Sequence, residues 1–289
     1  MSRNGSKMLL IAIGGFLAIV VVAIGVYASI HGTTGYRSPR KHVKPVSQAP
    51  IIWNATTNDK LVALTFDDGP DPRFTPAVLD TLKKYDAKAT FFLIGRHAQR
   101  YPELVKREMR EGHLVGDHTW DHPHLTQIPV GRVENEVDQA GDTIATITGS
   151  YPIYMRPPYG QINRAVYNTI HRRGYRVVQW STEFQELRHP GAEDDANYVA
   201  SRIKPGDIVL GHDGRLSYHW RGVKMLPFLI QKLKAKGYRL VTVDELLKRT
   251  GMITDKGDLD VAAAPTSITT RAGSSPGSPA PREPGAARP

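Results

Sequence analysis

Between residues 51 and 250, short apolar runs alternate with longer segments in which apolar residues recur every three or four positions. The short runs are typical of buried strands, and the longer segments predict amphipathic helices. The predicted strands are 61–66, 89–94, 113–115, 153–155, 175–179, 208–210 and 239–241, and the predicted helices are 75–85, 97–109 and 130–148. This alternation favours a parallel sheet, either open or closed into a barrel.

Glycines and a capping pattern support these boundaries. Gly112, Gly174 and Gly237 each separate a polar helical segment from an apolar run, as a glycine in the left-handed conformation does at the end of a helix. Thr242 and Glu245 have the spacing of a capping box and predict the start of a last helix.

Two polar segments follow predicted strands. Asp67 and Asp68 come directly after 61–66 and precede a Gly-Pro pair, which is also an ordinary turn sequence. His118 and His122 follow 113–115 and are four residues apart, one turn if that stretch is helical. One carboxylate and two imidazoles can hold a divalent metal with an open position, and the second carboxylate can act as a base. The two segments together predict a metal-dependent hydrolase.

Two further segments after strands carry polar residues suited to catalysis. The two prolines after Arg156 lack an N–H, so the Tyr159 amide is the next free backbone donor and suits an oxyanion site. Arg156 can orient an aspartate through a two-pronged hydrogen bond. His212 lies where a histidine can act as general acid. Taken alone, the first segment is more typical of a stiff turn, and the second of a capping or surface histidine.

The four segments occur in the order Thr-Phe-Asp-Asp-Gly, His-Thr-x-x-His, Arg-Pro-Pro-Tyr and Leu-x-His. In this order they resemble the polysaccharide deacetylase family, carbohydrate esterase family 4, over roughly residues 58–248. The resemblance implies a distorted, incomplete (β/α) barrel, which agrees with the strand–helix alternation.

The resemblance also implies roles for the polar residues. Asp68, His118 and His122 would bind a divalent metal, usually zinc, with cobalt, manganese and nickel as alternatives. Asp67 would be the general base, and Arg156 would orient it. The metal would activate a water and polarise the acetyl carbonyl, while Asp67 removes the proton of the water.

The remaining roles follow from the same resemblance. The Tyr159 amide would stabilise the oxyanion, and His212 would protonate the leaving amine. Leu210 would line the pocket for the acetyl methyl group, and Trp180 and Tyr159 would contact the substrate.

One segment departs from the family pattern, which often reads Trp-Asp-x-Asp-x-x-Asp-Trp and supplies an aspartate that supports the acid histidine. This chain has Ser181, Glu183 and Glu186 at the aspartate positions and Leu187 at that of the second tryptophan. Glu183 or Glu186 could substitute for the aspartate, with a side chain one methylene longer. The departure does not affect the metal triad.

The ends of the chain differ from its middle. Residues 8–30 carry no formal charge and are long enough to span a bilayer. We expect a transmembrane anchor in 1–30, with a cleaved signal peptide as the alternative because 26–28 resembles a cleavage site. Either reading exports the domain; basic residues on both sides of the segment leave a cytoplasmic domain as a third alternative.

The segments around the predicted catalytic domain, 58–250, are expected to lack a fold. Residues 31–57 have the composition of a basic flexible tether. Residues 251–289 are rich in Ala, Pro, Ser and Gly, bury too little apolar surface to fold, and are expected to be disordered.

Charge and cysteine content narrow the function. The formal net charge is +10, and residues 1–50 hold six Lys or Arg and no Asp or Glu. The chain lacks the interleaved basic and aromatic pattern of nucleic-acid binding, so we expect no nucleic-acid partner. Residues 51–250 have a smaller excess of Lys and Arg over Asp and Glu. This excess is either that of an ordinary solvated surface or suited to binding an anionic polymer such as a cell-wall glycan. Because cysteine is absent, disulfides, thiolate nucleophiles and Cys-ligated zinc are excluded.

The sequence therefore predicts a metal-dependent hydrolase that removes N-acetyl groups from N-acetylglucosamine residues of a polysaccharide. Peptidoglycan is the first expectation, because an anchor and a basic tether would hold the domain at a cell wall, and chitin oligomers come second. An O-acetyl esterase acting on xylan or another wall polysaccharide is an alternative, since the same metal chemistry serves both. A non-catalytic wall-glycan-binding protein is a further alternative, motivated by the departure at 181–187.

Overall fold

The computed structural model describes residues 50–184, 189–215 and 219–253. The predicted membrane segment at 8–30 and most of the predicted tether and tail lie outside these residues. Within the described ranges, no helix combines the length and the apolar character needed to cross a membrane.

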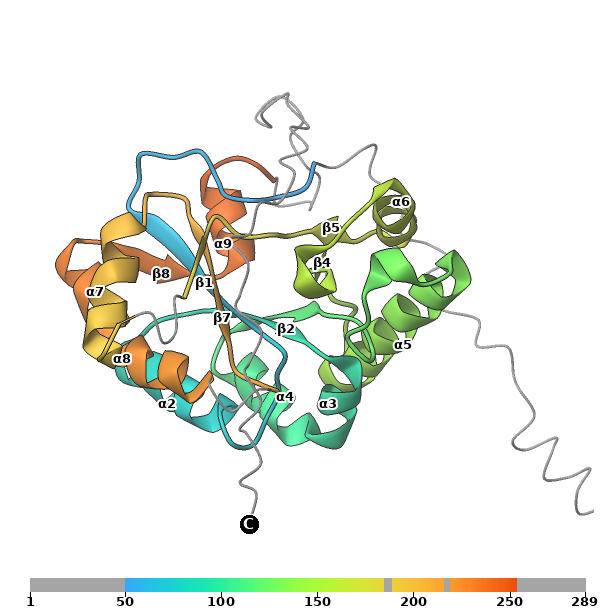
Figure 1. Cartoon of the computed structure of the whole chain (residues 1–289), viewed down its shortest axis with the longest axis horizontal. Coiled ribbons are helices and arrows are strands. Elements are labelled where there is room, and N and C mark those ends of the chain that lie inside the picture. The colour runs from blue at the N-terminus through green and yellow to red at the C-terminus, as the bar shows by residue number, and fades with distance from the viewer. Residues whose placement is uncertain (1–49, 185–188, 216–218, 254–289) are drawn as a thin grey trace, which may run out of the picture. The chain divides into compact units, whose positions relative to one another are not determined.

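A curled, parallel sheet forms the centre of the described domain (Figure 1). The strand order is β5-β4-β3-β2-β1-β7-β6, and β8 pairs with the first half of β1. The strands are β1 (Leu61–Asp67), β2 (Thr90–Leu93), β3 (Leu114–Asp117), β4 (Tyr154–Met155), β5 (Arg176–Val177), β6 (Thr182–Glu183), β7 (Ile208–His212) and β8 (Arg239–Val241). The result is a half-barrel, consistent with the distorted (β/α) barrel that the sequence predicts.

Helices cover the outside of the curled sheet (Figure 1). They are α2 (Thr75–Lys84), α3 (Gly95–Arg100), α4 (Pro102–Arg110), α5 (Val130–Thr148), α6 (Arg164–Arg172), α7 (Ala192–Arg202), α8 (Trp220–Ala235) and α9 (Val243–Arg249), with short 3-10 turns η1 (Leu125–Gln127) and η2 (Pro158–Gly160). The predicted helix at 130–148 has the bounds of α5. The glycine pattern indicated only the carboxyl ends of α6 and α8, and α7 and strand β6 were not predicted.

The helix predicted at 97–109 is instead two helices, α3 and α4. The chain leaves the helical conformation at Tyr101, where φ is −130° and ψ is 55°. The cause is Pro102, which has no N–H to donate and whose ring disfavours a helical conformation in the preceding residue.

The predicted helix ends are confirmed. Gly112, Gly174 and Gly237 have φ of 80°, 76° and 82°, in the left-handed region that glycine adopts without a steric penalty. The Thr242 side chain accepts a hydrogen bond from the Glu245 N–H at 3.1 Å, as a capping box requires.

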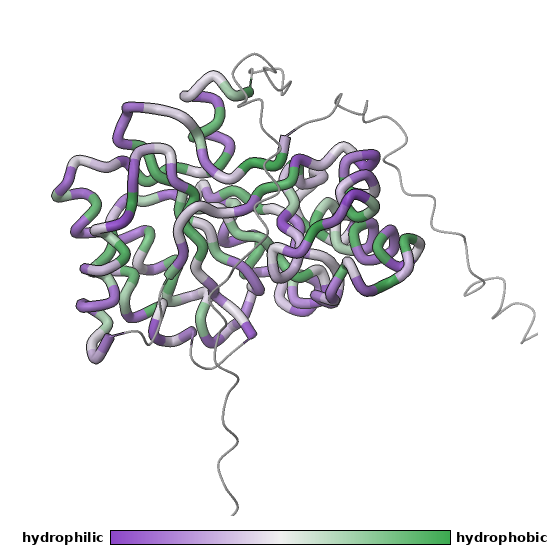
Figure 2. Tube along the Cα trace, turned by 45° about the horizontal axis from the view of Figure 1, so that its top comes forward, coloured by the Kyte–Doolittle hydropathy of each residue, from purple (hydrophilic) through white to green (hydrophobic). Residues whose placement is uncertain are grey.

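The core explains why β1 reads as a continuous apolar run. All seven residues of β1 are buried, because helices pack on the outer face of the sheet and other strands and α9 close over the inner face. Figure 2 shows hydrophobic residues along the central strands, while hydrophobic and hydrophilic residues alternate along the surrounding helices. The strand at the centre of this core is the one that ends in the two adjacent aspartates.

Residues on both sides of the predicted range 58–250 also pack against the sheet and its helices. Ile52 and Ala55 are buried at 1% and 4% exposure. Their N–H groups donate to the carbonyls of Val177 and Gly206, both at 2.9 Å, so this part of the predicted tether is fixed to the sheet. At the other end, Met252 and Ile253 are also buried.

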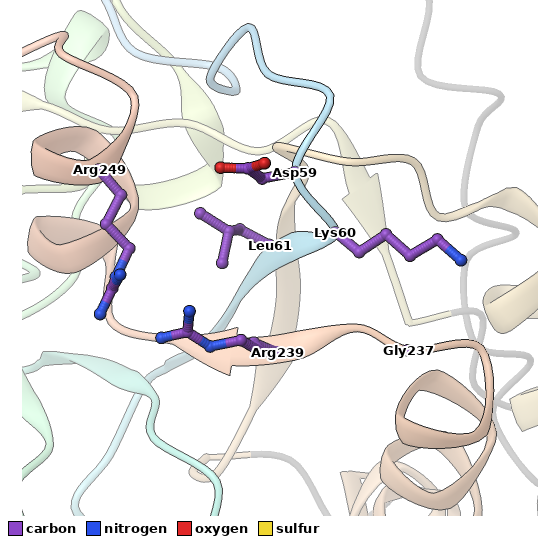
Figure 3. A pocket seen from close by; sticks show the side chains of 6 residues that line it. All are labelled: Asp59, Lys60, Leu61, Gly237, Arg239 and Arg249. Atoms are coloured by element: carbon purple, nitrogen blue, oxygen red, sulfur yellow. The ribbon is translucent and has the colours of Figure 1, made fainter.

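The two ends of the barrel differ in character. A surface hollow of about 540 Å³ lies at the amino ends of β1 and β8 (Figure 3), lined by Asp59, Lys60, Leu61, Gly237, Arg239 and Arg249. Leu61 begins β1 and Asp67 ends it, so at about 3.3 Å per residue this hollow is roughly 20 Å from the two aspartates. The predicted site residues lie at the carboxyl end, where parallel α/β folds place their chemistry.

Candidate functional site

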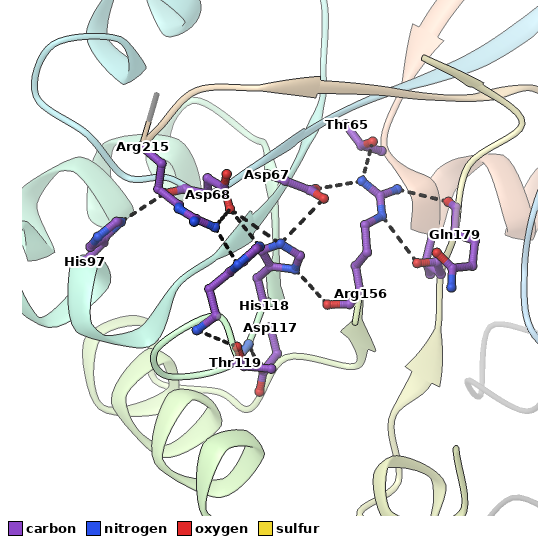
Figure 4. A network of polar contacts seen from close by, with 12 residues as sticks. Thr65, Asp67, Asp68, His97, Asp117, His118, Thr119, Arg156, Gln179 and Arg215 are labelled. Atoms are coloured by element: carbon purple, nitrogen blue, oxygen red, sulfur yellow. Dashed lines mark hydrogen bonds and ion pairs between the residues drawn. The ribbon is translucent and has the colours of Figure 1, made fainter. Parts of the chain in front are cut away.

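The sheet register brings the predicted segments together. Asp67 at the end of β1 is aligned with His212 at the end of β7, and Asp117 at the end of β3 is aligned with Met155 at the end of β4. The residues that follow these strands therefore converge on one network of polar contacts (Figure 4).

Asp67 and Asp68 both point toward His118, although adjacent residues of a strand normally point to opposite faces. The exception arises because Asp68 has a φ of 74° and so leaves the strand conformation. Oδ2 of Asp67 and Oδ1 of Asp68 are 3.7 Å and 3.6 Å from His118 Nε2. The turn at the end of β1 thus places two carboxylates beside one imidazole.

Asp68, His118 and His122 form a compact group of candidate metal ligands. One donor atom from each lies within 4.8 Å of the others, and all three side chains are buried. Asp68 Oδ1 is 3.2 Å from His122 Nε2, yet it accepts no hydrogen bond from any described residue. A buried carboxylate oxygen without a donor is costly, and a cation in this position would remove that cost.

A hydrogen bond to the backbone orients the His118 ring. Its Nδ1–H donates to the carbonyl of Arg156 at 2.7 Å, which leaves the Nε2 lone pair directed toward the aspartates. This is the usual arrangement of a metal-binding histidine, whose second nitrogen donates to a fixed acceptor.

The segment from His118 to His122 is a loop, so the helical alternative for this spacing is wrong. Thr119 and His122 have φ of 69° and 60°, which interrupts any helix. The loop is held by hydrogen bonds from the Thr119 N–H to Asp117 Oδ1 at 2.8 Å and from the His122 N–H to Thr119 Oγ1 at 3.1 Å.

Burial sets the protonation of these ligands. It lowers the pKa of His118 to about 3 and that of His122 to about 2, so both rings are neutral, the form that binds metal. Burial also raises the pKa of Asp68 to about 7, with the nearby Arg215 opposing the shift. Two neutral imidazoles and one carboxylate fit a first-row divalent ion such as zinc.

Arg215 is a part of the site that the motifs did not indicate. It follows β7 with a φ of 65°, and its Nη1 lies close against His122 Nδ1. The same nitrogen is 3.7 Å from Asp68 Oδ1, too far for a hydrogen bond but close enough for attraction. Its charge would partly oppose that of a bound metal.

The predicted contact between Arg156 and Asp67 is present. Arg156 is completely buried, and its Nη1 donates to Asp67 Oδ1 at 2.7 Å. The bond is single rather than two-pronged, because Nη2 donates to the Gln179 carbonyl at 3.0 Å and Nε to the Val178 carbonyl at 3.3 Å. Burial raises the pKa of Asp67 in spite of this arginine.

Tyr159 borders the metal group. Its φ is 59°, the residue is 48% exposed, and its N–H donates to no other described residue. The ring stacks on His124 at 3.9 Å between centroids and meets His122 edge-on at 4.6 Å. A non-glycine residue in the left-handed region with a free amide is a feature of functional sites.

His212, Leu210 and Trp180 lie beside residues of the same network, next to Asp67, Thr65 and Arg156 respectively. Burial lowers the pKa of His212 to about 3. Its ring stacks on that of His219, at 4.4 Å between centroids and 17° between planes, a contact that the sequence did not indicate. Leu210 is 6% exposed, and the Arg156 guanidinium lies 5.7 Å from the Trp180 ring.

In the segment that differs from the family pattern, 181–187, Glu183 is not buried beside His212 as a supporting carboxylate would be. Glu183 is exposed on β6, whereas the next residue, Phe184, packs over Gly211. Ser181 instead donates to Asp207 Oδ1 at 2.7 Å. Glu186 and Leu187 lie outside the described residues.

The half-barrel and the Asp-His-His group at its carboxyl end define a hydrolase of the metal-dependent class. The polysaccharide deacetylase family model matches residues 54–178. A peptidoglycan-N-acetylglucosamine deacetylase of Bacillus cereus is 41% identical over 211 residues, which cover 72% of this chain and 97% of that protein.

Two further comparisons agree. The peptidoglycan-N-acetylmuramic acid deacetylase PdaC of Bacillus subtilis is 36% identical over 209 residues, which cover 71% of this chain but only 43% of PdaC. The crystal structure of the Bc1960 peptidoglycan N-acetylglucosamine deacetylase superposes with a TM-score of 0.66 at 34% identity, covering 68% of this chain and 92% of that one. The chain belongs to the polysaccharide deacetylase family, as the four motifs predicted.

Proposed function

We propose that this protein is a metal-dependent deacetylase that removes the N-acetyl group from N-acetylglucosamine residues of peptidoglycan. The observation that carries the proposal is the buried group of Asp68, His118 and His122 beside the arginine-paired Asp67. The substrate is proposed by similarity to the B. cereus relative, whose name states it.

The metal would be held by Asp68, His118 and His122, and zinc suits this donor set, with cobalt, manganese and nickel as alternatives. When bound, it would activate a water and polarise the acetyl carbonyl. Asp68 Oδ1, which has no hydrogen-bond donor among the described residues, is the oxygen we assign to it.

Asp67 is proposed as the general base. Arg156 holds its Oδ1, so Oδ2, which faces His118, is the oxygen available to take a proton from the attacking water. The free Tyr159 amide would donate to the developing oxyanion. The His212 ring, beside Asp67 in the sheet register, would deliver a proton to the departing amine.

Acetate release tests this function. We expect the purified protein to release acetate from peptidoglycan, to lose this activity with a chelator, and to regain it with zinc. The Asp67→Asn variant should bind metal normally and release no acetate, whereas His118→Ala should lose metal. A fully active Asp67→Asn variant would contradict the assignment of the base.

The choice of substrate is tested by parallel assays. Chitin oligomers, acetylated xylan and peptidoglycan should be compared, and mass spectrometry of the digested peptidoglycan should locate the lost acetyl groups. Acetate from xylan alone would favour the O-acetyl esterase, and loss from muramic acid residues alone would favour a PdaC-like specificity. Release from none of them would favour a glycan-binding protein.

We also propose that the domain lies outside the cytoplasm and that the segment at 8–30 anchors it to the membrane. The support is the uncharged composition of that segment and the location of a peptidoglycan substrate. Protease treatment of intact protoplasts should digest the domain, while an intact domain under these conditions would contradict the proposal. Protein in the medium rather than in the membrane fraction would indicate cleavage instead.

A further inference from the structure

His219 lies against the proposed general acid. It is 2% exposed, precedes α8, and stacks face to face on His212 with 4.4 Å between centroids. Its Nδ1 is 2.5 Å from the carbonyl oxygen of Gly214. A carbonyl only accepts, so Nδ1 carries a proton and the orientation of the ring is fixed by the backbone.

The carbonyl that holds His219 is itself tightly packed. A Cβ added at Gly214 would lie 2.2 Å from the backbone oxygen of Asp68, so no larger residue fits between the two loops. His219 is therefore tied to the loop that packs against the candidate metal ligand, and it presents a flat face to His212.

His212 has no comparable anchor of its own, because no described residue makes a hydrogen bond to its ring. The charged or titratable groups that act on it are Asp67 from β1, His118 after β3, Arg156 after β4 and His219 before α8. Arg215 and Asp67 also act on His219. Of these neighbours, His219 is the one whose ring stacks on that of His212.

We propose that His219 is a positioning residue that holds the His212 imidazole in the orientation from which it protonates the leaving amine. The inference rests on the proposed deacetylase function. Without the stacked ring, the His212 side chain could rotate into the vacated space, and its proton would no longer point at the departing nitrogen. Because a general acid contributes about 10²- to 10⁴-fold, loss of its alignment should cost a substantial part of that factor.

The test compares two leaving groups. An amine must be protonated to leave, whereas the phenolate of 4-nitrophenyl acetate leaves without a proton. We expect His219→Ala to lower kcat for acetate release from an N-acetylglucosamine oligomer about tenfold or more, with KM changed less than about twofold. Hydrolysis of 4-nitrophenyl acetate and the metal content should stay close to those of the unaltered enzyme.

Further variants separate the ring from its hydrogen bond. His219→Phe keeps a stacking ring and should retain more amide activity than His219→Asn, which keeps an N–H but lacks the ring; this comparison also serves if His219→Ala does not fold. His171→Ala is the matched control, since His171 stacks on Tyr167 at 5.5 Å and 13°, on α6. It should leave both activities unchanged.

A double variant tests whether His219 acts through His212. His219→Ala should cause little further loss of amide activity in a His212→Ala background. The proposal would be overturned if His219→Ala lost equal activity on both substrates, bound less metal, or kept full amide activity. Full additivity of the two losses in the double variant would also overturn it. If the unaltered enzyme hydrolysed the aryl ester but released no acetate from any N-acetylated glycan, the proposed function would fail first, and this inference with it.

Discussion

Arg156 offers a quantitative test of how the active site is built. Among the described residues, it is the largest that is completely buried. We consider Arg156→Met, which keeps an unbranched side chain and removes the charge. The change leaves Asp67 buried without its 2.7 Å partner and takes donors from Thr65 Oγ1 and from two backbone carbonyls.

The magnitude follows from the balance within the pair. Burial lowers the pKa of Arg156 and raises the pKa of Asp67, and in both cases it outweighs their attraction. The pair as a whole therefore contributes little net stability, but removing one partner leaves an uncompensated buried charge. Such a change costs about 3–5 kcal/mol, a large part of the roughly 5–15 kcal/mol that stabilises a domain.

Urea unfolding of the unaltered and variant proteins measures this loss. The matched control is Arg73→Met, because Arg73 pairs with Asp71 at 2.6 Å but its side chain is 55% exposed. Solvent screens that pair, so we expect a much smaller change. An Arg156→Met variant that is no less stable than Arg73→Met would refute the reasoning.

The double variant Asp67→Asn/Arg156→Met sharpens the test. It removes both charges, so it should be more stable than Arg156→Met alone. If the two losses added in full, the cost would arise from packing around Arg156 and not from the unpaired carboxylate.

Three other substitutions each test the surroundings of a single residue. Glu108 is completely buried, no described residue bonds either carboxyl oxygen, and burial raises its pKa well above the usual value of 4.5. Because the pKa of Glu108 is higher in the folded than in the unfolded state, the free energy of unfolding is greatest below about pH 4.5, where both states are protonated. It falls as pH rises toward the folded-state pKa, because only the unfolded state ionises there. Glu108→Gln should flatten this fall in urea unfolding measured across pH. Arg215→Met removes a charge 3.7 Å from Asp68 Oδ1. It should tighten zinc binding about tenfold, or roughly 1.4 kcal/mol after allowance for solvent, measured by competition with a chelating dye. Gly206 has a φ of 85°, and an added Cβ would lie 1.8 Å from the Ala55 carbonyl oxygen, so Gly206→Ala should lower stability by at least about 2 kcal/mol in thermal unfolding. Unchanged values in these assays would contradict the respective contacts.

The sequence predicted the parts of the site that depend on periodicity. Strand runs were visible at β1, β3, β4 and β7, and polar residues followed each of them. Because parallel strands end at one edge, those residues had to converge, and Asp67 beside His212 shows that they do. The helix caps were also predictable, because they depend on the local backbone geometry that glycines and the capping box indicate.

Contacts between distant loops could not be predicted in this way. Arg215 and His122 are 93 residues apart, and nothing near either residue indicates that they meet. The conformation of the 118–122 loop depends on positive φ at Thr119 and His122, which is uncommon outside glycine and rare for a β-branched residue such as threonine. His219 lies outside the four motifs, and only its packing on His212 gives it a place in the site.

The adjacent aspartates show how a local conformation can separate two chemically identical groups. Asp67 is still part of β1, and its Oδ1 is held by Arg156. Asp68 has already turned to a φ of 74°, and its Oδ1 lies 3.2 Å from His122 without a hydrogen-bond donor among the described residues. In the proposed mechanism, Asp67 therefore offers an oxygen to a proton beside a fixed cation, and Asp68 offers an oxygen to the metal. The two could not exchange these proposed roles, because exchange would require moving the end of the central strand.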